Sequence, residues 1–238
     1  MARFFLDPGD WSGASALTGA EAAHCARVMR ADIGDRVEVF DGAGRSASAI
    51  VTSVSKSRVD LELGEIVEEP YPQVPVHLVI AVLKGKAMDL LIQKAVELGA
   101  SSIIPVVCER TIPRKESGQT EKWRRTVLEA CKQSGRSRMP EIAPLATFAD
   151  AVDRSPEPAE LRVIASLAEG AQPSREVIGP QERPQSLWIL VGPEGDFTAS
   201  ETQRALETGW RPVSLGNHVL RSETAAMFLL SAAAYEFQ

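Results

Sequence analysis

Two strand–turn–helix patterns follow one another near the end of the chain. In the first, the apolar run Trp188–Val191 is typical of a buried strand in a parallel sheet. The turn Gly192–Gly195 (GPEG) ends it, because proline cannot donate to a sheet ladder and glycine permits positive φ. Thr198 and Glu201 then have the spacing of a capping box, which predicts that a helix begins there.

The second pattern repeats this order. Pro212–Leu215 is a predicted strand, residues 216–217 (GN) are a turn, and Ser222 can cap a helix over Glu223–Phe237. Parallel sheets bind ligands in the crevice at the carboxyl ends of their strands, where both turns would lie. The first turn lacks G-x-G-x-x-G and the G-K-[ST] of a phosphate-binding loop, and it contains an acid. We therefore expect a neutral or cationic ligand rather than a phosphate.

From Val76 onwards, short apolar runs alternate with amphipathic segments, which predicts an α/β domain with a parallel sheet. In the last predicted helix, Ala225–Ala234 (AAMFLLSAAA) is apolar on nearly all sides. This run is therefore expected either in the core or against a second subunit. The other predicted strands are Val76–Leu83, Ser102–Val107 and Leu161–Ser166, and the other predicted helices are Met88–Leu98, closed by Gly99, and Lys122–Gln133.

Residues 1–70 have the pattern of a small β-rich domain, which from this pattern alone is a barrel or a sandwich. Arg36–Phe40 (RVEVF) alternates as a half-buried strand does, and a glycine turn follows it. Residues 71–75 lie in a proline-rich stretch without periodicity and are interpreted as the linker to a second domain, residues 76–238. The remaining predictions are strands over Arg45–Ser55 and Ser57–Leu63 and a short helix over Ala20–Met29.

The formal net charge of −6 over 238 residues does not by itself indicate a nucleic-acid-binding protein. No apolar run has the length of a membrane helix, and the N-terminus lacks the pattern of a secretory signal. Cys25, Cys108 and Cys131 are scattered and lack C-x-x-C spacing, so they are interpreted as reduced thiols of a cytoplasmic protein.

Basic residues nevertheless gather locally. Residues 110–138 contain nine basic residues against three acidic ones, and His24, Arg27 and Arg30 form a second small cluster. Phosphate binding is one interpretation of these clusters, and solvated helix surfaces are the other. Any contact with RNA must come from such patches rather than from the total charge.

The two turn regions resemble the signature segments of the SPOUT methyltransferases. The closest resemblance is to the RsmE-type family, the 16S ribosomal RNA uridine-N3 methyltransferases, and it spans nearly the whole chain in order. The segments that carry it are LVGPEGDFTASE (190–201) and SLGNHVLRSETAAM (214–227), supported by KGKAMDLLIQKAVELG (84–99), EACKQSGRSRMPEI (129–142), RFF (3–5) and HCARVMR (24–30).

The resemblance implies a fold and partners. Residues 1–70 would form a PUA-like β-barrel that docks on RNA, and residues 76–238 a SPOUT parallel-sheet domain whose C-terminal segment forms a trefoil knot. It also implies a homodimer paired through the last helix, with 16S rRNA or the small ribosomal subunit as partner, and no membrane.

The implied activity is methyl transfer from S-adenosylmethionine to N3 of one uridine, without a metal. The positive sulfonium and apolar-faced adenine of this cofactor suit a main-chain pocket with apolar walls. The residues expected to bind or shape that pocket are Leu167, Leu190, Val191, Gly192, Glu194, Gly195, Leu215, Gly216, Val219, Leu220 and Thr224. The residues expected to bind RNA are Arg3, His24, Arg27, Arg30, Arg110, Arg114, Arg136 and Arg138.

Arg221 is the first candidate for a catalytic role. Uridine N3 carries a proton, so its methylation needs a proton acceptor or stabilisation of the uracil anion. A guanidinium stays protonated and cannot be a general base, but it can stabilise an anion at O2 or O4 or hold a phosphate. The alternative is a structural ion pair with Glu194 or Glu223. No general base is identified.

Three residues differ from the family pattern. Asp196 stands where glycine is usual, His218 where arginine or another residue is common, and Ser222 in place of a common threonine. Asp196 affects the φ and the charge of the loop, and it therefore affects the details of substrate recognition.

Three other functions are open. One is a SPOUT methyltransferase with another target, such as ribose 2′-O or a different base. Another is a non-catalytic RNA-binding protein of the same fold, against which the intact glycine turns and Arg221 argue. The third is a generic α/β binding protein for another nucleotide, which the missing phosphate-binding loop disfavours.

Overall fold

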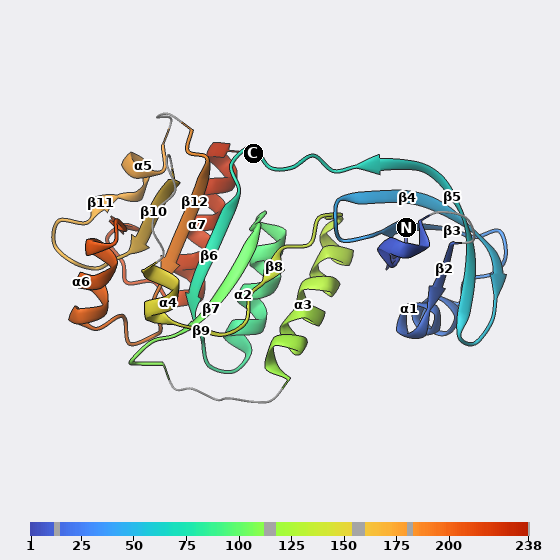
Figure 1. Ribbon diagram of the computed structural model, residues 1–238, viewed down its shortest axis with the longest axis horizontal. Helices are drawn as coiled ribbons and strands as arrows, with labels where there is room; N and C mark the ends of the chain where they lie inside the picture. Colours follow the sequence, from blue (N-terminus) through green and yellow to red (C-terminus); the bar gives the residue numbers. More distant parts are fainter. Residues whose placement is uncertain (12–14, 112–117, 154–159, 180–182, 238) are drawn as a thin grey trace. The chain divides into compact units, whose positions relative to one another are not determined.

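The computed structural model describes residues 1–11, 15–111, 118–153, 160–179 and 183–237 (Figure 1). The chain divides into two compact units, Met1–Tyr71 with Leu128–Met139 and Pro72–Val127 with Pro140–Gln238. The division runs through helix α3 (Gln119–Ser134). Residues 128–139 fall in the predicted second domain, but they pack with the first unit.

The first unit contains a five-stranded sheet in the order β1-β3-β4-β5-β2. Strand β1 pairs in parallel with β3, and the remaining pairs are antiparallel. Along β4, Ala47, Ala49 and Val51 are buried while their neighbours are not, because successive side chains of a strand point to opposite faces. The elements are β1 (Arg3–Phe5), η1 (Pro8–Asp10), β2 (Ser15–Thr18), α1 (Gly19–Ala23), the π-helical turn η2 (His24–Val28), β3 (Arg36–Phe40), β4 (Arg45–Val54) and β5 (Arg58–Glu68).

Arg3 fastens strand β1 to residues that lie more than 120 positions further along the chain. Its Nε lies 3.1 Å from Glu38 Oε1, and its Nη1 donates to the carbonyls of Cys131 and Arg136 at 2.9 and 2.8 Å. Its Nη2 donates to Ser137 Oγ at 2.7 Å, and the residue is 8% exposed. The prediction that Arg3 binds RNA is therefore wrong, because its guanidinium is engaged inside the first unit.

Replacing Arg3 by methionine is expected to lower the free energy of unfolding by about 2–4 kcal/mol, because the change leaves buried acceptors without their donor. Urea unfolding followed by circular dichroism measures this. Replacement of the exposed Arg58 by methionine is the control and is expected to have an effect below about 0.5 kcal/mol. Equal effects of the two changes would contradict the structural role of Arg3.

The second unit is an α/β domain with an eight-stranded sheet among the described residues. Its strands run in the order β11-β13-β10-β12-β6-β7-β8, with β9 also paired to β7, and every recorded pair is parallel. The strands are β6 (Val76–Ala81), β7 (Ser102–Val107), β8 (Glu141–Ile142), β9 (Ala146–Thr147), β10 (Glu160–Ala165), β11 (Gln172–Pro173), β12 (Ser186–Val191) and β13 (Arg211–Ser214).

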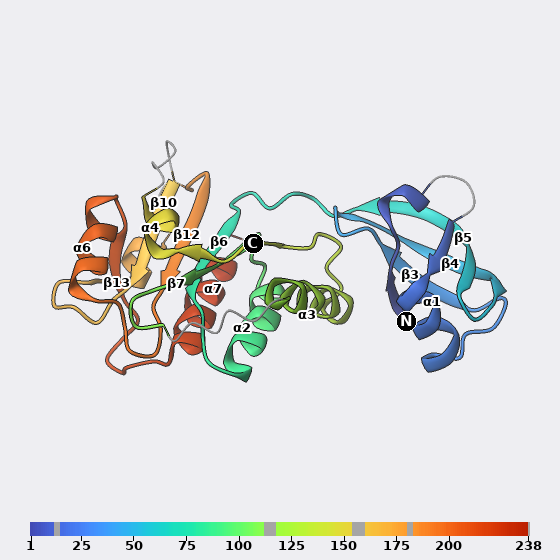
Figure 2. The ribbon, with the colours of Figure 1, turned by 60° about the horizontal axis from the view of Figure 1, so that its bottom comes forward.

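Helices cover both faces of this sheet (Figure 2). Helices α2 (Lys86–Glu97) and α7 (Ser222–Phe237) pack against each other, and α7 also packs on β6 and β12. Helices α4 (Phe148–Val152) and α6 (Ala199–Glu207) share a core with Leu190 of β12. A short helix, α5 (Ser174–Val177), contacts β13.

The long predicted elements are confirmed within two or three residues at either end, except that β5 continues five residues beyond its predicted end at Leu63. The capping box of Thr198 and Glu201 is present, with both reciprocal hydrogen bonds. The two-residue strands and the short helices α4 and α5 were not predicted, because elements of this length show no periodicity. The knot stays a prediction. None of the helices in the described part of the chain has the length and apolarity that a membrane span requires.

All three cysteines are free and buried. Burial raises the pKa of the Cys108 thiol to about 12 and that of Cys131 to about 11, and it also raises the pKa of Cys25. The thiolate is the reactive form, so the folded protein is expected to resist alkylation by iodoacetamide at pH 8. Mass spectrometry should find three modified cysteines after unfolding and almost none before. Fast labelling of the folded protein would contradict this burial.

Candidate functional site

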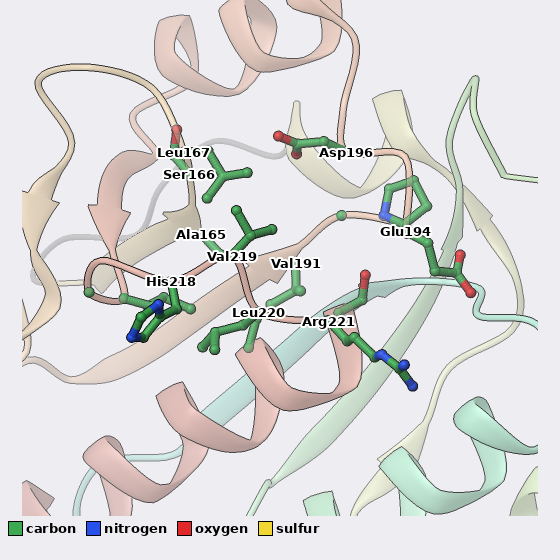
Figure 3. A pocket seen from close by; sticks show the side chains of 16 residues that line it. Ala165, Ser166, Leu167, Val191, Glu194, Asp196, His218, Val219, Leu220 and Arg221 are labelled. Carbon is green, nitrogen blue, oxygen red and sulfur yellow. The ribbon is translucent and has the colours of Figure 1, made fainter.

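A pocket of about 250 Å³ lies at the carboxyl ends of the adjacent strands β10, β12 and β13, beside the start of α7 (Figure 3). This is the edge at which parallel sheets bind ligands. The lining residues are Ala165, Ser166, Leu167, Val191, Gly192, Pro193, Glu194, Asp196, Leu215, Gly216, His218, Val219, Leu220, Arg221, Ser222 and Ala225.

Two positions in the lining require glycine for different reasons. A Cβ on Gly192 would lie 3.2 Å from the ring of Phe197 and 3.3 Å from Asp196 Oδ1, so these neighbours would have to shift by a few tenths of an ångström to admit one. Gly216 has space around it, but its φ of +114° is one that other residues rarely adopt. The two turns therefore bring main-chain atoms to the pocket wall.

The structure brings most of the predicted cofactor residues together. Leu167, Val191, Gly192, Glu194, Leu215, Gly216, Val219 and Leu220 line the pocket, as does Arg221. Whether these residues bind a cofactor stays a prediction.

Three predicted residues do not line the pocket. Leu190 points into the core under α4 and α6, because adjacent residues of a strand face opposite sides of the sheet. Thr224 is exposed on α7, whose residues Ser222 and Ala225 are the ones that reach the pocket. Gly195 is exposed, and its carbonyl accepts a hydrogen bond from Arg110.

The remaining lining residues had weaker signals in the sequence. Asp196 and His218 stand out only as departures from the family pattern, and Ser222 stands out also as the predicted cap of the last helix. Four more are ordinary small or cyclic residues, and only their position after a predicted strand or at the start of a helix could have indicated them: Ala165, Ser166, Pro193 and Ala225.

The rim of the pocket carries both signs of charge. Glu194 Oε1 accepts a 3.3 Å hydrogen bond from the backbone N–H of Lys84, and Asp196 Oδ1 accepts one of 2.8 Å from the N–H of Phe197. Arg221 is exposed, and no ion pair is recorded for it in the described part of the chain. Glu194 and Arg221 lie on one side of the pocket and His218 on the other (Figure 3). The alternative of an ion pair between Arg221 and Glu194 or Glu223 is therefore not observed.

The predicted RNA-binding residues are not one cluster within a single unit. In the first unit, Arg27 and Arg30 are exposed, and His24 packs edge-on against the ring of Phe4. Arg138 Nη2 donates to the carbonyl of Glu69 at 3.0 Å, which occupies part of its guanidinium.

The other predicted RNA-binding residues differ from these in burial and in the unit to which they belong. Arg136, partly buried, has a pKa lowered by that burial. Arg110 belongs to the second unit, and Arg114 lies outside the described residues. RNA binding by these side chains stays a prediction.

Comparison with known proteins agrees with this architecture. A family model for an RNA methyltransferase domain matches residues 69–234, and one for an RNA methyltransferase PUA domain matches residues 17–64. The protein named ribosomal RNA small subunit methyltransferase E from Synechocystis sp. is 31% identical over 215 residues, which are 90% of this chain and 71% of that protein. Its namesake from Aquifex aeolicus is 32% identical over 179 residues, covering 74% of this chain and 75% of that protein.

Solved structures are similar over nearly the whole chain. The ribosomal RNA small subunit methyltransferase E of Neisseria gonorrhoeae, bound to S-adenosyl methionine, has a TM-score of 0.86 at 29% identity, with 98% of this chain and 96% of that chain covered. A putative methyltransferase of Legionella pneumophila in complex with the same cofactor has a TM-score of 0.88 at 27% identity, covering 99% and 97%.

Fold and site together define a two-domain RNA methyltransferase, in which a PUA domain precedes a parallel-sheet domain with a pocket at its strand ends. The chain belongs to the family of ribosomal RNA small subunit methyltransferase E. The predicted family, the α/β fold and the N-terminal PUA domain are thereby confirmed.

Proposed function

We propose that this protein transfers a methyl group from S-adenosylmethionine to N3 of one uridine in the 16S rRNA of the small ribosomal subunit. The observation that carries the proposal is the composition of the pocket. Residues of both family signature segments line it, although residues 202–213 separate these segments in the sequence. Family membership and the cofactor-bound structures of similar proteins support the same conclusion. The protein would work in the cytoplasm, where ribosomal subunits are found.

The residues of the pocket fit this cofactor. Its walls include the apolar side chains of Leu167, Val191, Val219 and Leu220, which suit the faces of an adenine. Acidic Glu194 and Asp196 favour a positive ligand over a phosphate. When bound, S-adenosylmethionine supplies a methyl group activated by its positive sulfonium.

The chain's own contribution is to position the nucleotide and to stabilise charge. The target nitrogen carries a proton, and its loss leaves negative charge on the uracil oxygens. We assign this stabilisation to Arg221, which lies on the rim without an ion pair among the described residues and would donate to O2 or O4 of the base. Because a guanidinium remains charged at working pH, this contribution does not depend on its titration.

The first unit would hold the rRNA. Arg27 and Arg30 are exposed near the end of the π-helical turn η2, and Val28 and Met29 beside them are also exposed. Arginines provide charge for phosphates, and apolar neighbours provide a surface for unstacked bases. The match of residues 17–64 to an RNA methyltransferase PUA domain supports this role.

A homodimer is the proposed assembly. Phe228 and Tyr235 of α7 are 43% and 89% exposed, and Leu90 of the neighbouring α2 is 43% exposed. Burying these side chains against a second copy would remove apolar surface from water. Light scattering is expected to give twice the chain mass for the native protein and a monomer for Phe228→Glu. A monomeric native protein would refute the assembly.

Calorimetric titration with S-adenosylmethionine separates the proposed enzyme from a non-catalytic RNA-binding protein of the same fold. The proposal predicts saturable binding of one cofactor per chain, and competition by S-adenosylhomocysteine. An absence of binding at millimolar cofactor would favour the non-catalytic alternative.

A further inference from the structure

We propose that Arg110 is a positioning residue of the cofactor pocket, and that it stabilises the unusual backbone conformation of Asp196. Arg110 is not among the lining residues, so it acts through the loop that follows β12. The consequence for cofactor binding rests on the proposed function, whereas the consequence for the loop does not.

Asp196 has a φ of +60°, which lies in the left-handed region. Among the described residues, only Arg30 and Asp196 have positive φ without being glycine. Aspartate tolerates this region better than most residues but still less well than glycine, so the surroundings must hold it there. Two local bonds help: the N–H of Asp196 donates to the carbonyl of Pro193 at 2.9 Å, and Asp196 Oδ1 accepts from Phe197 N.

Arg110 forms hydrogen bonds to the backbone on both sides of this residue, and we call this pair of bonds the bracket. Its Nη1 donates to the carbonyl of Gly195 at 2.7 Å and to that of Phe197 at 3.4 Å, which are the carbonyls on either side of Asp196. The stem of Arg110 also packs on Gly195, since Cδ and Cβ would lie 3.6 and 3.7 Å from a Cβ built there. A charged donor makes the shorter of these bonds stronger than a neutral one.

A second stabilising contact comes from Glu109, the residue next to Arg110. The backbone N–H of Glu109 donates to Glu201 Oε1 at 2.8 Å. Glu201 Oε2 at the same time accepts from the N–H of Thr198 at 2.9 Å, which closes the capping box of α6. The chain after β7 thus holds both the loop and the helix start that follow the pocket turn. Arg110 thus contacts the protein's own backbone, and its contact with RNA stays a prediction.

The proposal predicts that Arg110 and Asp196 are energetically coupled. Without Arg110, the loop is free to move Asp196 to negative φ, which shifts the adjoining pocket wall at Gly192 and Glu194. Glycine at position 196 adopts the same φ without strain, so the loop then depends less on the bracket. Two residues that share one local structure should give non-additive effects in a double-mutant cycle.

The test uses the full-length native protein, Arg110→Met, Asp196→Gly and the double variant. Calorimetry is expected to show a roughly tenfold higher Kd for S-adenosylmethionine in Arg110→Met, as the loss of a charged hydrogen bond allows. Asp196→Gly also removes an acidic side chain from the rim, so its own Kd is the reference for the double variant, and adding Arg110→Met to it should raise that Kd by less than about threefold. Arg125→Met, at an exposed arginine of α3, is the control and should bind like the native protein.

Hydrogen exchange without cofactor tests the bracket itself. The amides of residues 195–198 should exchange faster in Arg110→Met than in the native protein, and this acceleration should be much smaller in the Asp196→Gly background. Arg110→Lys keeps the charge but lacks the planar guanidinium, so its amide exchange rates should lie between those of the native protein and those of Arg110→Met. Additive effects in both measurements, or unchanged exchange in Arg110→Met, would overturn the proposal. If the native protein binds no cofactor, the proposed function is refuted. Hydrogen exchange alone then tests whether Arg110 stabilises the conformation of Asp196.

Discussion

Replacing Arg221 by methionine is expected to lower kcat for rRNA methylation by about 10²–10³-fold, the size of effect seen when one donor to a developing anion is removed. The side chain lies on the pocket rim and has no ion pair among the described residues, so its removal leaves no buried partner unsatisfied. The Kd for S-adenosylmethionine should therefore stay within about twofold of native. Single-turnover methylation of small ribosomal subunits at saturating cofactor measures the rate.

The control for this change is Arg175→Met, at an exposed arginine of α5 outside the pocket lining, which should methylate at the native rate. Arg221→Lys should recover part of the rate, because it restores a charge but not the planar fork. A kcat unchanged in Arg221→Met would remove Arg221 from the reaction. A normal kcat with a raised KM for rRNA would instead assign it to RNA binding.

Replacing Gly192 by valine is expected to raise the Kd for S-adenosylmethionine by about 10–100-fold, which corresponds to about 1–3 kcal/mol of overpacking. Even a single Cβ here would press on the buried ring of Phe197 at 3.2 Å, so the two branches of valine must displace the loop that forms the pocket wall. Calorimetric titration measures the Kd, and thermal unfolding shows whether the variant is folded.

Ala199→Val is the matched control, since it introduces the same side chain at an exposed position of the first turn of α6. It should bind the cofactor like the native protein. Native affinity in a folded Gly192→Val protein would show that the turn does not shape the cofactor site.

Local sequence patterns predicted the elements that are long enough to show a period. The strand Ser102–Val107 has the predicted bounds, and the capping box placed the start of α6 correctly. Strands of two residues, such as β8 and β11, form only because neighbouring strands supply their partners, so nothing in their own sequence marks them.

The site was predicted through the resemblance of its two segments, and the errors have geometric causes. Motif position alone does not tell which of two adjacent residues faces the ligand, so Leu190 was included with Val191 although strand alternation turns it into the core. The roles of Arg3 and Arg110 depend on acceptors more than 80 positions away. Such pairs arise from tertiary packing, and a count of basic residues treats them as free charges.

Asp196 illustrates how a departure from a family pattern can leave the fold intact. Its φ is the one that glycine would adopt, and two carbonyls beside it are held by Arg110. We therefore expect the substitution to change the charge of the rim more than the path of the loop.

The most direct test of the central claim is to identify the methylated nucleoside. Small ribosomal subunits from cells lacking this protein would be incubated with the purified protein and labelled S-adenosylmethionine, and the rRNA nucleosides would be separated by mass spectrometry. We expect label in 3-methyluridine at one position of 16S rRNA, and loss of that label with Arg221→Met. Label in another nucleoside, or on a ribose 2′-O, would contradict the assignment to uridine N3, and the absence of any label would contradict the methyltransferase account itself.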